Sequence, residues 1–119
     1  MPAAFNTQTS GINVNANYVA PVSVAASGTT QATATAVTDS FVLINNNTTT
    51  NGVVLPLLNV GQEVYIYPQL ATNAPKVYPP VGGSINGGTV NASVAPAAQK
   101  MAIFIAIDGL GNYVTNLSA

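Results

Sequence analysis

The sequence predicts an all-β fold: a single antiparallel β-sandwich or jelly-roll-like domain with an extended N-terminal arm. Apolar and polar residues alternate with a period of two in several segments, which is typical of strands with one face turned toward a core. Proline and glycine interrupt the chain at short intervals, and no segment shows the 3.6-residue period of an amphipathic helix. With 119 residues, the chain is long enough for one domain with a modest core.

The first 30 residues are predicted to form a tail and an arm, and residues 31–119 are predicted to form the β-sandwich body. Residues 12–24 alternate, and Pro21 restricts this segment to an edge strand or an extended arm. The apolar face of the segment supplies the candidate interface residues Ile12, Val14, Tyr18, Val22 and Val24. Two interpretations stay open, namely an arm laid on a neighbouring subunit and an ordinary edge strand of the same domain.

Short strands separated by turn residues are predicted throughout the body. The candidate strands are residues 41–44, 53–55, 63–67, 76–78, 89–95, 101–107 and 113–117. Asn51-Gly52 is a typical hairpin dipeptide, and Gly82-Gly83 and Gly87-Gly88 are expected to supply turn positions with positive φ. Residues 101–107 are apolar on both faces, which predicts a central strand buried on both sides. A hairpin with residues 113–117 is expected to follow it.

The composition is unusual for a free monomer, because 48% of the residues are apolar and only 4% are charged, against about a quarter in ordinary soluble domains. One explanation is that much of the surface is buried against other subunits. The net charge is −1 and there is no basic patch, so we expect no nucleic-acid partner. The N-terminus lacks the features of a signal peptide, and no apolar run approaches the roughly 20 residues of a membrane span. We therefore expect no membrane partner.

The residues that could carry chemistry are few. Histidine and cysteine are absent, which removes Ser–His and Cys–His catalysis and the usual zinc ligands. The three carboxylates are Asp39, Glu63 and Asp108. A calcium site made by all three, or a glycosidase pair of Asp39 and Asp108, is conceivable, but the three residues are scattered along the chain. We expect no enzyme, no catalytic residue, no cofactor and no metal ion.

The middle of the chain carries a recognisable pattern. Val54-Leu55-Pro56 is followed by the segment VYPPVGGSINGG, which spans Val77 to Gly88, and by a late apolar strand around Phe104. This pattern resembles small β-rich structural proteins of tailed bacteriophages, of the kind that decorate or cement the capsid shell. The resemblance covers roughly residues 31–119, and it brings no catalytic residue with it.

The resemblance implies a virion structural protein at the capsid surface, acting as a capsid decoration (cement) protein. Its partners would be the major capsid protein and further copies of the chain, in a homo-oligomer that we expect to be a trimer. An alternative is a tail-fibre or receptor-binding module of a phage tail, with the loop from Asn45 to Asn51 as its tip. A solvated hairpin loop is the simpler interpretation of that loop. A small glycan-active enzyme is the rival from another class.

Overall fold

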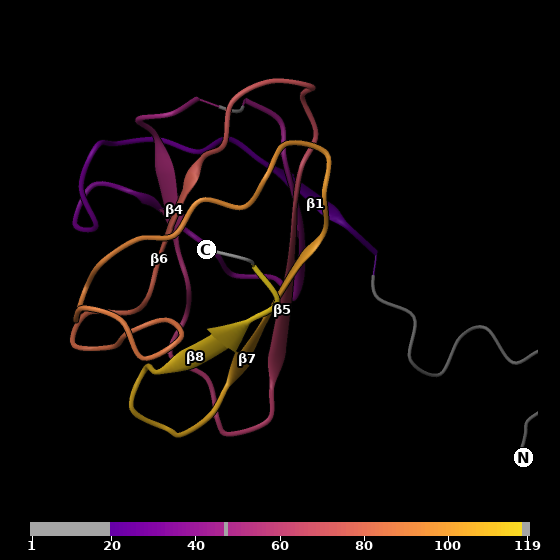
Figure 1. Cartoon of the computed structure of the whole chain (residues 1–119). Coiled ribbons are helices and arrows are strands. Elements are labelled where there is room, and N and C mark those ends of the chain that lie inside the picture. The colour runs from indigo at the N-terminus through magenta and orange to yellow at the C-terminus, as the bar shows by residue number, and fades with distance from the viewer. Residues whose placement is uncertain (1–19, 47, 118–119) are drawn as a thin grey trace, which may run out of the picture.

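A computed structural model describes residues 20–46 and 48–117. Over these residues the chain is all strand, without a helix, and its two sheets contribute to one hydrophobic core (Figure 1). The strands are β1 (Val22–Val24), β2 (Thr35–Ala36), β3 (Phe41–Ile44), β4 (Gly52–Val54), β5 (Glu63–Pro68), β6 (Lys76–Tyr78), β7 (Ala102–Ala106) and β8 (Tyr113–Thr115).

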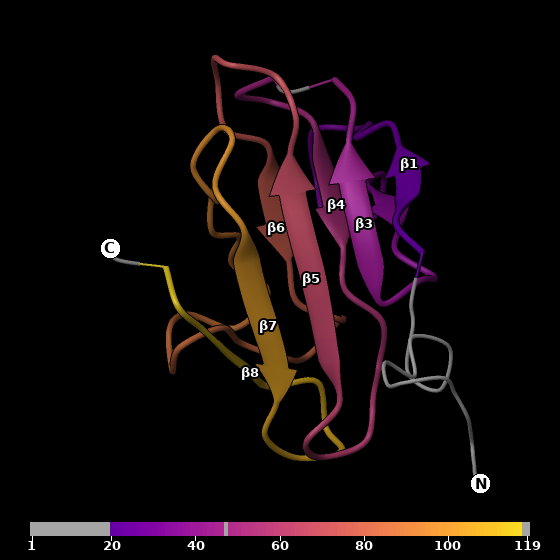
Figure 2. The same ribbon diagram turned by 90° about the vertical axis from the view of Figure 1, so that its right-hand side faces the viewer.

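The chain alternates between the two sheets from β1 to β6. The five-stranded sheet has the order β1-β3-β5-β7-β8, and the three-stranded sheet has the order β2-β4-β6. Figure 2 shows the larger sheet in front of the smaller one. Strands β1, β3 and β5 are parallel to one another, as are β2, β4 and β6. The first six strands therefore wind as a coil in which each turn adds one strand to each sheet, as in a short β-solenoid.

The prediction of an antiparallel sandwich or jelly roll is wrong in strand direction for the pairs β1–β3, β3–β5, β2–β4 and β4–β6, which are parallel. Only β5–β7 and β7–β8 are antiparallel among the described strands. The physical reason is that period-two alternation fixes which face of a strand is buried and is the same for either direction. The proline and glycine turns carry the chain across to the other sheet, and not back along the same sheet.

The predicted hairpin near the C-terminus is confirmed, because β7 pairs with β8 in antiparallel register. The central position of β7 is also confirmed, since it lies between β5 and β8. Burial on both sides is wrong. Ala102, Phe104 and Ala106 are buried, whereas Ile103 and Ile105 are only half-buried. The opposite side of this strand faces away from the core.

Both sheets supply the core. Its buried members are Ala26, Val37, Val42, Ile44, Val53, Leu55, Val64, Ile66, Val77, Ile85, Ala102, Phe104, Ala106 and Tyr113. Tyr113 is fully buried, and its hydroxyl donates a 2.6 Å hydrogen bond to the carbonyl oxygen of Pro56. Burial raises the pKa of the Tyr113 hydroxyl to about 12. This side chain thus fastens β8 to the connection that follows β4.

Gly52 is not a hairpin turn residue, and that prediction is wrong. It is the first residue of β4 and pairs with Lys76 of β6. A β-carbon at this position would lie 2.9 Å from the Lys76 carbonyl oxygen and 2.9 Å from the ring of Tyr78. Glycine is required here because a neighbouring strand and an aromatic ring pack against its backbone.

The segment VYPPVGGSINGG begins in β6 and continues as two turns. Hydrogen bonds from the amide of Gly83 to the Pro80 carbonyl and from the amide of Gly88 to the Ile85 carbonyl close these turns. The prediction that the two glycine pairs supply positive φ is confirmed, because one glycine of each pair, Gly82 and Gly87, has a positive φ. Residues 89–95 are not a strand, because only Val94 bridges to Val77, through hydrogen bonds of 2.7 and 2.9 Å. The reason is that Asn91 has a φ of 67°, which breaks an extended strand.

Candidate functional site

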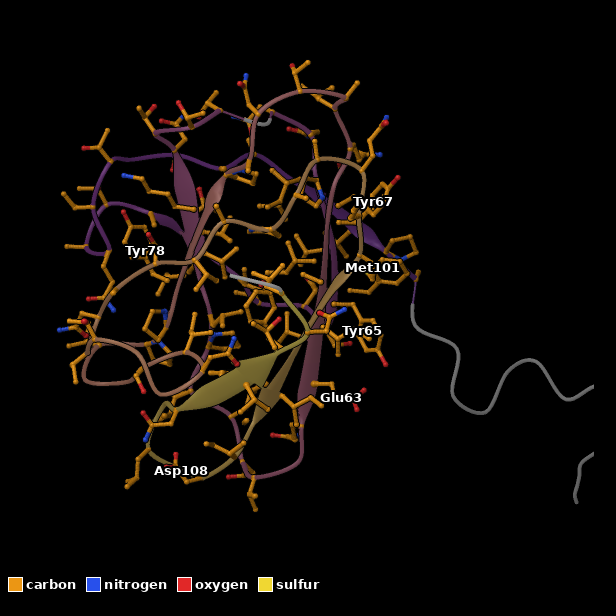
Figure 3. The ribbon with its side chains drawn as sticks, in the orientation of Figure 1. Glu63, Tyr65, Tyr67, Tyr78, Met101 and Asp108 are labelled. Carbon is orange, nitrogen blue, oxygen red and sulfur yellow. The ribbon has the colours of Figure 1, made fainter. Side chains whose placement is uncertain are left out.

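The side of the five-stranded sheet that faces away from the core carries a continuous set of apolar side chains. We define the outer face as Phe41, Leu43, Tyr65, Tyr67, Met101, Ile103, Ile105 and Val114, all of which are half-buried or exposed. No described segment crosses in front of β3, β5 and β7 (Figure 2). Figure 3 shows Tyr65, Tyr67 and Met101 on this side, and Tyr78 beside the smaller sheet.

The strand register builds the outer face in rows. Phe41, Tyr65 and Ile103 are cross-strand partners, and so are Leu43 and Tyr67. The rings of Phe41 and Tyr65 lie 6.2 Å apart between centroids and are tilted by 49°. Cross-strand aromatic and β-branched pairs of this kind stabilise a sheet by about 0.2–1 kcal/mol each. The face is therefore an ordered surface and not a set of unrelated exposed residues.

The outer face carries one charged residue, Glu63, and Lys100 lies in the turn that precedes β7. Glu63 begins β5 and pairs with Ile105. Lys100 precedes Met101 at the other end, where the amide of Gln99 donates a 2.8 Å hydrogen bond to the carbonyl of Pro68, the last residue of β5. Both charged residues are exposed, and within the described ranges neither forms an ion pair.

The hydroxyl of Tyr65 donates a 2.7 Å hydrogen bond to Oε1 of Glu63. This hydrogen bond, followed by the negative charge of Glu63, raises the pKa of Tyr65 above its ordinary value. One oxygen of the Glu63 carboxylate therefore accepts a hydrogen bond from a tyrosine of the same face. Glu63 itself is exposed at the end of that face.

A pocket of about 520 Å³ adjoins this end of the outer face. Its lining includes Asp39, Ser40, Leu58, Glu63 and Tyr65. The structure thus brings two of the three carboxylates, Asp39 and Glu63, to one pocket, and it does not bring Asp108 to them as the conceivable calcium site and the glycosidase pair would require. Two exposed carboxylates beside hydroxyl and apolar groups accept hydrogen bonds, but the pocket holds no histidine or cysteine to act as base or nucleophile.

Asp108 lies in the β7–β8 turn, outside the residues that line this pocket (Figure 3). Its carboxylate accepts hydrogen bonds from the Asn112 side chain at 2.8 Å and from the Leu110 amide at 2.9 Å. These bonds lower the pKa of Asp108 below its ordinary value of 3.8. The residue therefore organises a turn. Across residues 20–46 and 48–117, no three acidic, histidine or cysteine side chains gather to hold a metal ion.

The candidate interface residues divide between described and undescribed parts of the chain. Ile12, Val14 and Tyr18 lie outside the described residues. Val22 and Val24 belong to β1, at the edge of the five-stranded sheet. Val22 is 37% exposed, whereas Val24 packs against the core of its own chain.

The loop after β3 uses its asparagine side chains internally. Asn45 donates a 3.0 Å hydrogen bond to the Ser23 hydroxyl. Asn46 accepts a 2.7 Å hydrogen bond from the amide of Ala26 and donates a 2.9 Å hydrogen bond to its carbonyl. These hydrogen bonds hold the loop against β1 and the residues that follow it. The amide groups of Asn45 and Asn46 that form them are therefore not available to an external ligand.

The outer face was missed by the sequence analysis. The available signal was that three strands, at residues 41–44, 63–67 and 101–107, carry large apolar side chains at successive positions and not only at alternate ones. That signal was interpreted as burial on both sides for residues 101–107 alone. An equally apolar strand arises when one side faces the core and the other side is left for a partner.

No helix in the described part of the chain is long and apolar enough to cross a membrane. Comparisons of the chain with protein-family models, with curated proteins and with solved structures find no match.

Proposed function

We propose that this chain is a virion structural protein that decorates the capsid shell of a tailed bacteriophage, in contact with the major capsid protein and with further copies of itself. The observation that carries the proposal is the apolar outer face. Its three rows contain one charged residue, Glu63, at one end. A contiguous apolar surface of this kind suits permanent burial against protein.

The proposal includes a two-sheet sandwich body and an N-terminal arm that grips a neighbour. The support for the arm is the alternation of residues 12–24, together with the position of β1 at the edge of the five-stranded sheet. Apolar burial stabilises by about 25 cal/mol per Å², and a shell repeats each contact many times.

The number of copies of this chain in purified phage particles tests whether it lies on the capsid shell or in the tail. Quantitative mass spectrometry should find the chain in particles at on the order of hundreds of copies, as expected for a surface that follows the symmetry of the shell. A few dozen copies or fewer would contradict decoration and favour the tail-fibre alternative.

A pair of double variants tests the surface. Ile103→Thr with Ile105→Thr makes the centre of the outer face polar, and Val81→Thr with Val90→Thr makes the same kind of change at exposed loop positions. We expect the first variant to fold and to be lost from particles, and the second to stay bound. Retention of both variants would show that the outer face is not the contact.

A further inference from the structure

We propose that Asn86 is a site of spontaneous covalent modification, at which the chain converts asparagine to aspartate and isoaspartate without an enzyme. The reaction is that of an asparagine followed by glycine. The sequence contains two such pairs, Asn51-Gly52 and Asn86-Gly87, and the structure distinguishes them. The inference does not rest on the proposed function, because it concerns the chemistry of one turn.

The reaction needs only the chain and water. The backbone nitrogen of the glycine attacks the side-chain carbonyl carbon of the asparagine. A carbon–nitrogen bond forms, the side-chain nitrogen leaves as ammonia, and a five-membered succinimide ring results. Water then opens the ring at either of its carbonyl groups, which gives aspartate or isoaspartate. Glycine favours the attack because it has no β-carbon to crowd the nitrogen. Base accelerates the attack because the nitrogen must lose its proton.

The attacking nitrogen is accessible at Gly87. Asn86 and Gly87 are exposed at the centre of a turn, with φ of 54° and 70°. Within the described ranges, no residue accepts a hydrogen bond from the Gly87 amide. A β-carbon built on Gly87 would meet no atom within 4 Å, so the turn has open space around it.

The side chain of Asn86 is held so that its carbon can be attacked. Its Oδ1 accepts a 2.9 Å hydrogen bond from the amide of Thr115 in β8. A donor at this oxygen stabilises the negative charge that develops there during the attack. No residue in the described part of the chain accepts a hydrogen bond from Nδ2, the atom that leaves as ammonia.

Little of the structure must open to bring the two atoms together. Rotation about the bond between the α-carbon and the carbonyl carbon of Asn86 moves Gly87 and breaks the 3.0 Å hydrogen bond from the Gly88 amide to the Ile85 carbonyl. The hydrogen bonds from Asn86 to Tyr113 and Thr115 lie before that bond and can remain. Opening a surface turn costs much less free energy than unfolding a sheet.

The pair Asn51-Gly52 is protected by the same criteria. Gly52 is buried in β4, and its amide donates a 3.2 Å hydrogen bond to the Ser27 carbonyl. The carbonyl of Asn51 accepts a 3.0 Å hydrogen bond from the amide of Lys76. Since β4 is the central strand of its sheet, attack there requires the sheet to separate.

Conversion of Asn86 changes the end of the turn that contacts β8. It adds one negative charge to a chain whose net charge is −1. In isoaspartate, the carbonyl that accepts from Thr115 becomes part of the main chain and must also position Gly87. We therefore expect the turn to hold β8 less firmly, and the amide of Thr115 to exchange with solvent faster in aged protein. Unchanged exchange in an isoaspartyl sample would overturn this effect on β8.

Incubation of the folded, full-length chain tests the assignment. Trypsin cleaves after Lys76 and Lys100, which places Asn51 and Asn86 in different peptides. Mass spectrometry of these peptides measures conversion, and labelling by an isoaspartyl methyltransferase identifies isoaspartate. We expect Asn86 to convert at least about tenfold faster than Asn51, because only its turn opens readily. The rate should rise with pH.

The wild-type chain unfolded in urea is the matched control, because it removes the structural difference between the two pairs. Both asparagines should then convert at similar rates. Equal conversion of Asn51 and Asn86 in the folded chain would overturn the inference. It would also be overturned if Asn86 stayed intact in the folded chain over a time in which the unfolded chain converts. Asn86→Gln should remove the labelling from its peptide, and labelling that persists there would place the reaction at another residue.

Discussion

Replacing Gly83 with alanine tests the tight contact between two turns beside the core. A β-carbon on Gly83 would lie 2.5 Å from the carbonyl carbon of Gly111 and even closer to its oxygen. Carbon atoms pack at about 3.5–4.0 Å, so one turn must move by about 1 Å or more. Both contacting atoms belong to backbone, and no side chain can rotate away.

The expected loss of stability follows from the hydrogen bonds that this movement would break. The amide of Ser84 donates a 3.0 Å hydrogen bond to Asn112 Oδ1, and the amide of Tyr113 donates a 2.9 Å hydrogen bond to the Ser84 carbonyl. Each contributes about 1 kcal/mol. Overpacking costs about 1–3 kcal/mol in addition. We therefore expect Gly83→Ala to lower the free energy of unfolding by about 3–5 kcal/mol.

Thermal and urea denaturation, followed by circular dichroism, measure this change. The expected fall in Tm is roughly 12–20 °C, at about 4 °C per kcal/mol. Gly109→Ala is the matched control, because a β-carbon there meets no atom within 4 Å and the residue does not have a positive φ. It should stay within about 0.5 kcal/mol of the wild type. If Gly83→Ala were as stable as Gly109→Ala, the close approach of the two turns would be refuted.

Three further substitutions probe single interactions. Tyr113→Phe leaves the carbonyl of the half-buried Pro56 without its donor, so we expect a loss of about 1–2 kcal/mol in urea denaturation; an unchanged midpoint would contradict the hydrogen bond. The lowered pKa of Asp108 means that its carboxylate stabilises the fold above pH 3.8 and that this contribution disappears as the pH falls below that value. Asp108→Asn should therefore reduce stability at pH 7 and flatten the acid side of a stability–pH curve; parallel curves would argue against it. Asn46→Ala removes two hydrogen bonds to Ala26, and we expect a loss of about 1–2 kcal/mol and faster amide exchange at Ala26.

The sequence predicted the local elements well where alternation and turn chemistry agree. The strand at Glu63–Pro68 and the hairpin formed by β7 and β8 follow from apolar alternation bounded by proline or by the glycine-rich turn at residues 108–112. In these segments the chain pairs with a close neighbour in sequence or ends at a residue that cannot continue a strand. Local residue types are then sufficient.

Strand direction and the outer face could not be predicted from local sequence patterns. Gly52 follows an asparagine, as in a hairpin, yet glycine is required there by close contacts with Lys76 and with the Tyr78 ring, 26 positions further along the chain. Ile103 and Ile105 are as apolar as buried residues, and the sequence does not say whether their partner is the same chain or another molecule. Both outcomes depend on contacts between segments far apart in sequence.

The coil described by β1 to β6 has a consequence for the order of folding. None of these strands is hydrogen-bonded to the next strand along the chain, so each pairing must close a loop that contains a strand of the other sheet. The hairpin of β7 and β8 closes only a short turn, which is fast and entropically inexpensive. We expect it to form first and to offer its free edge to β5, after which β3 and β1 would add in turn, from the C-terminal side toward the N-terminus. During synthesis on the ribosome, the first half of the chain would then form no stable sheet until the hairpin of β7 and β8 has emerged.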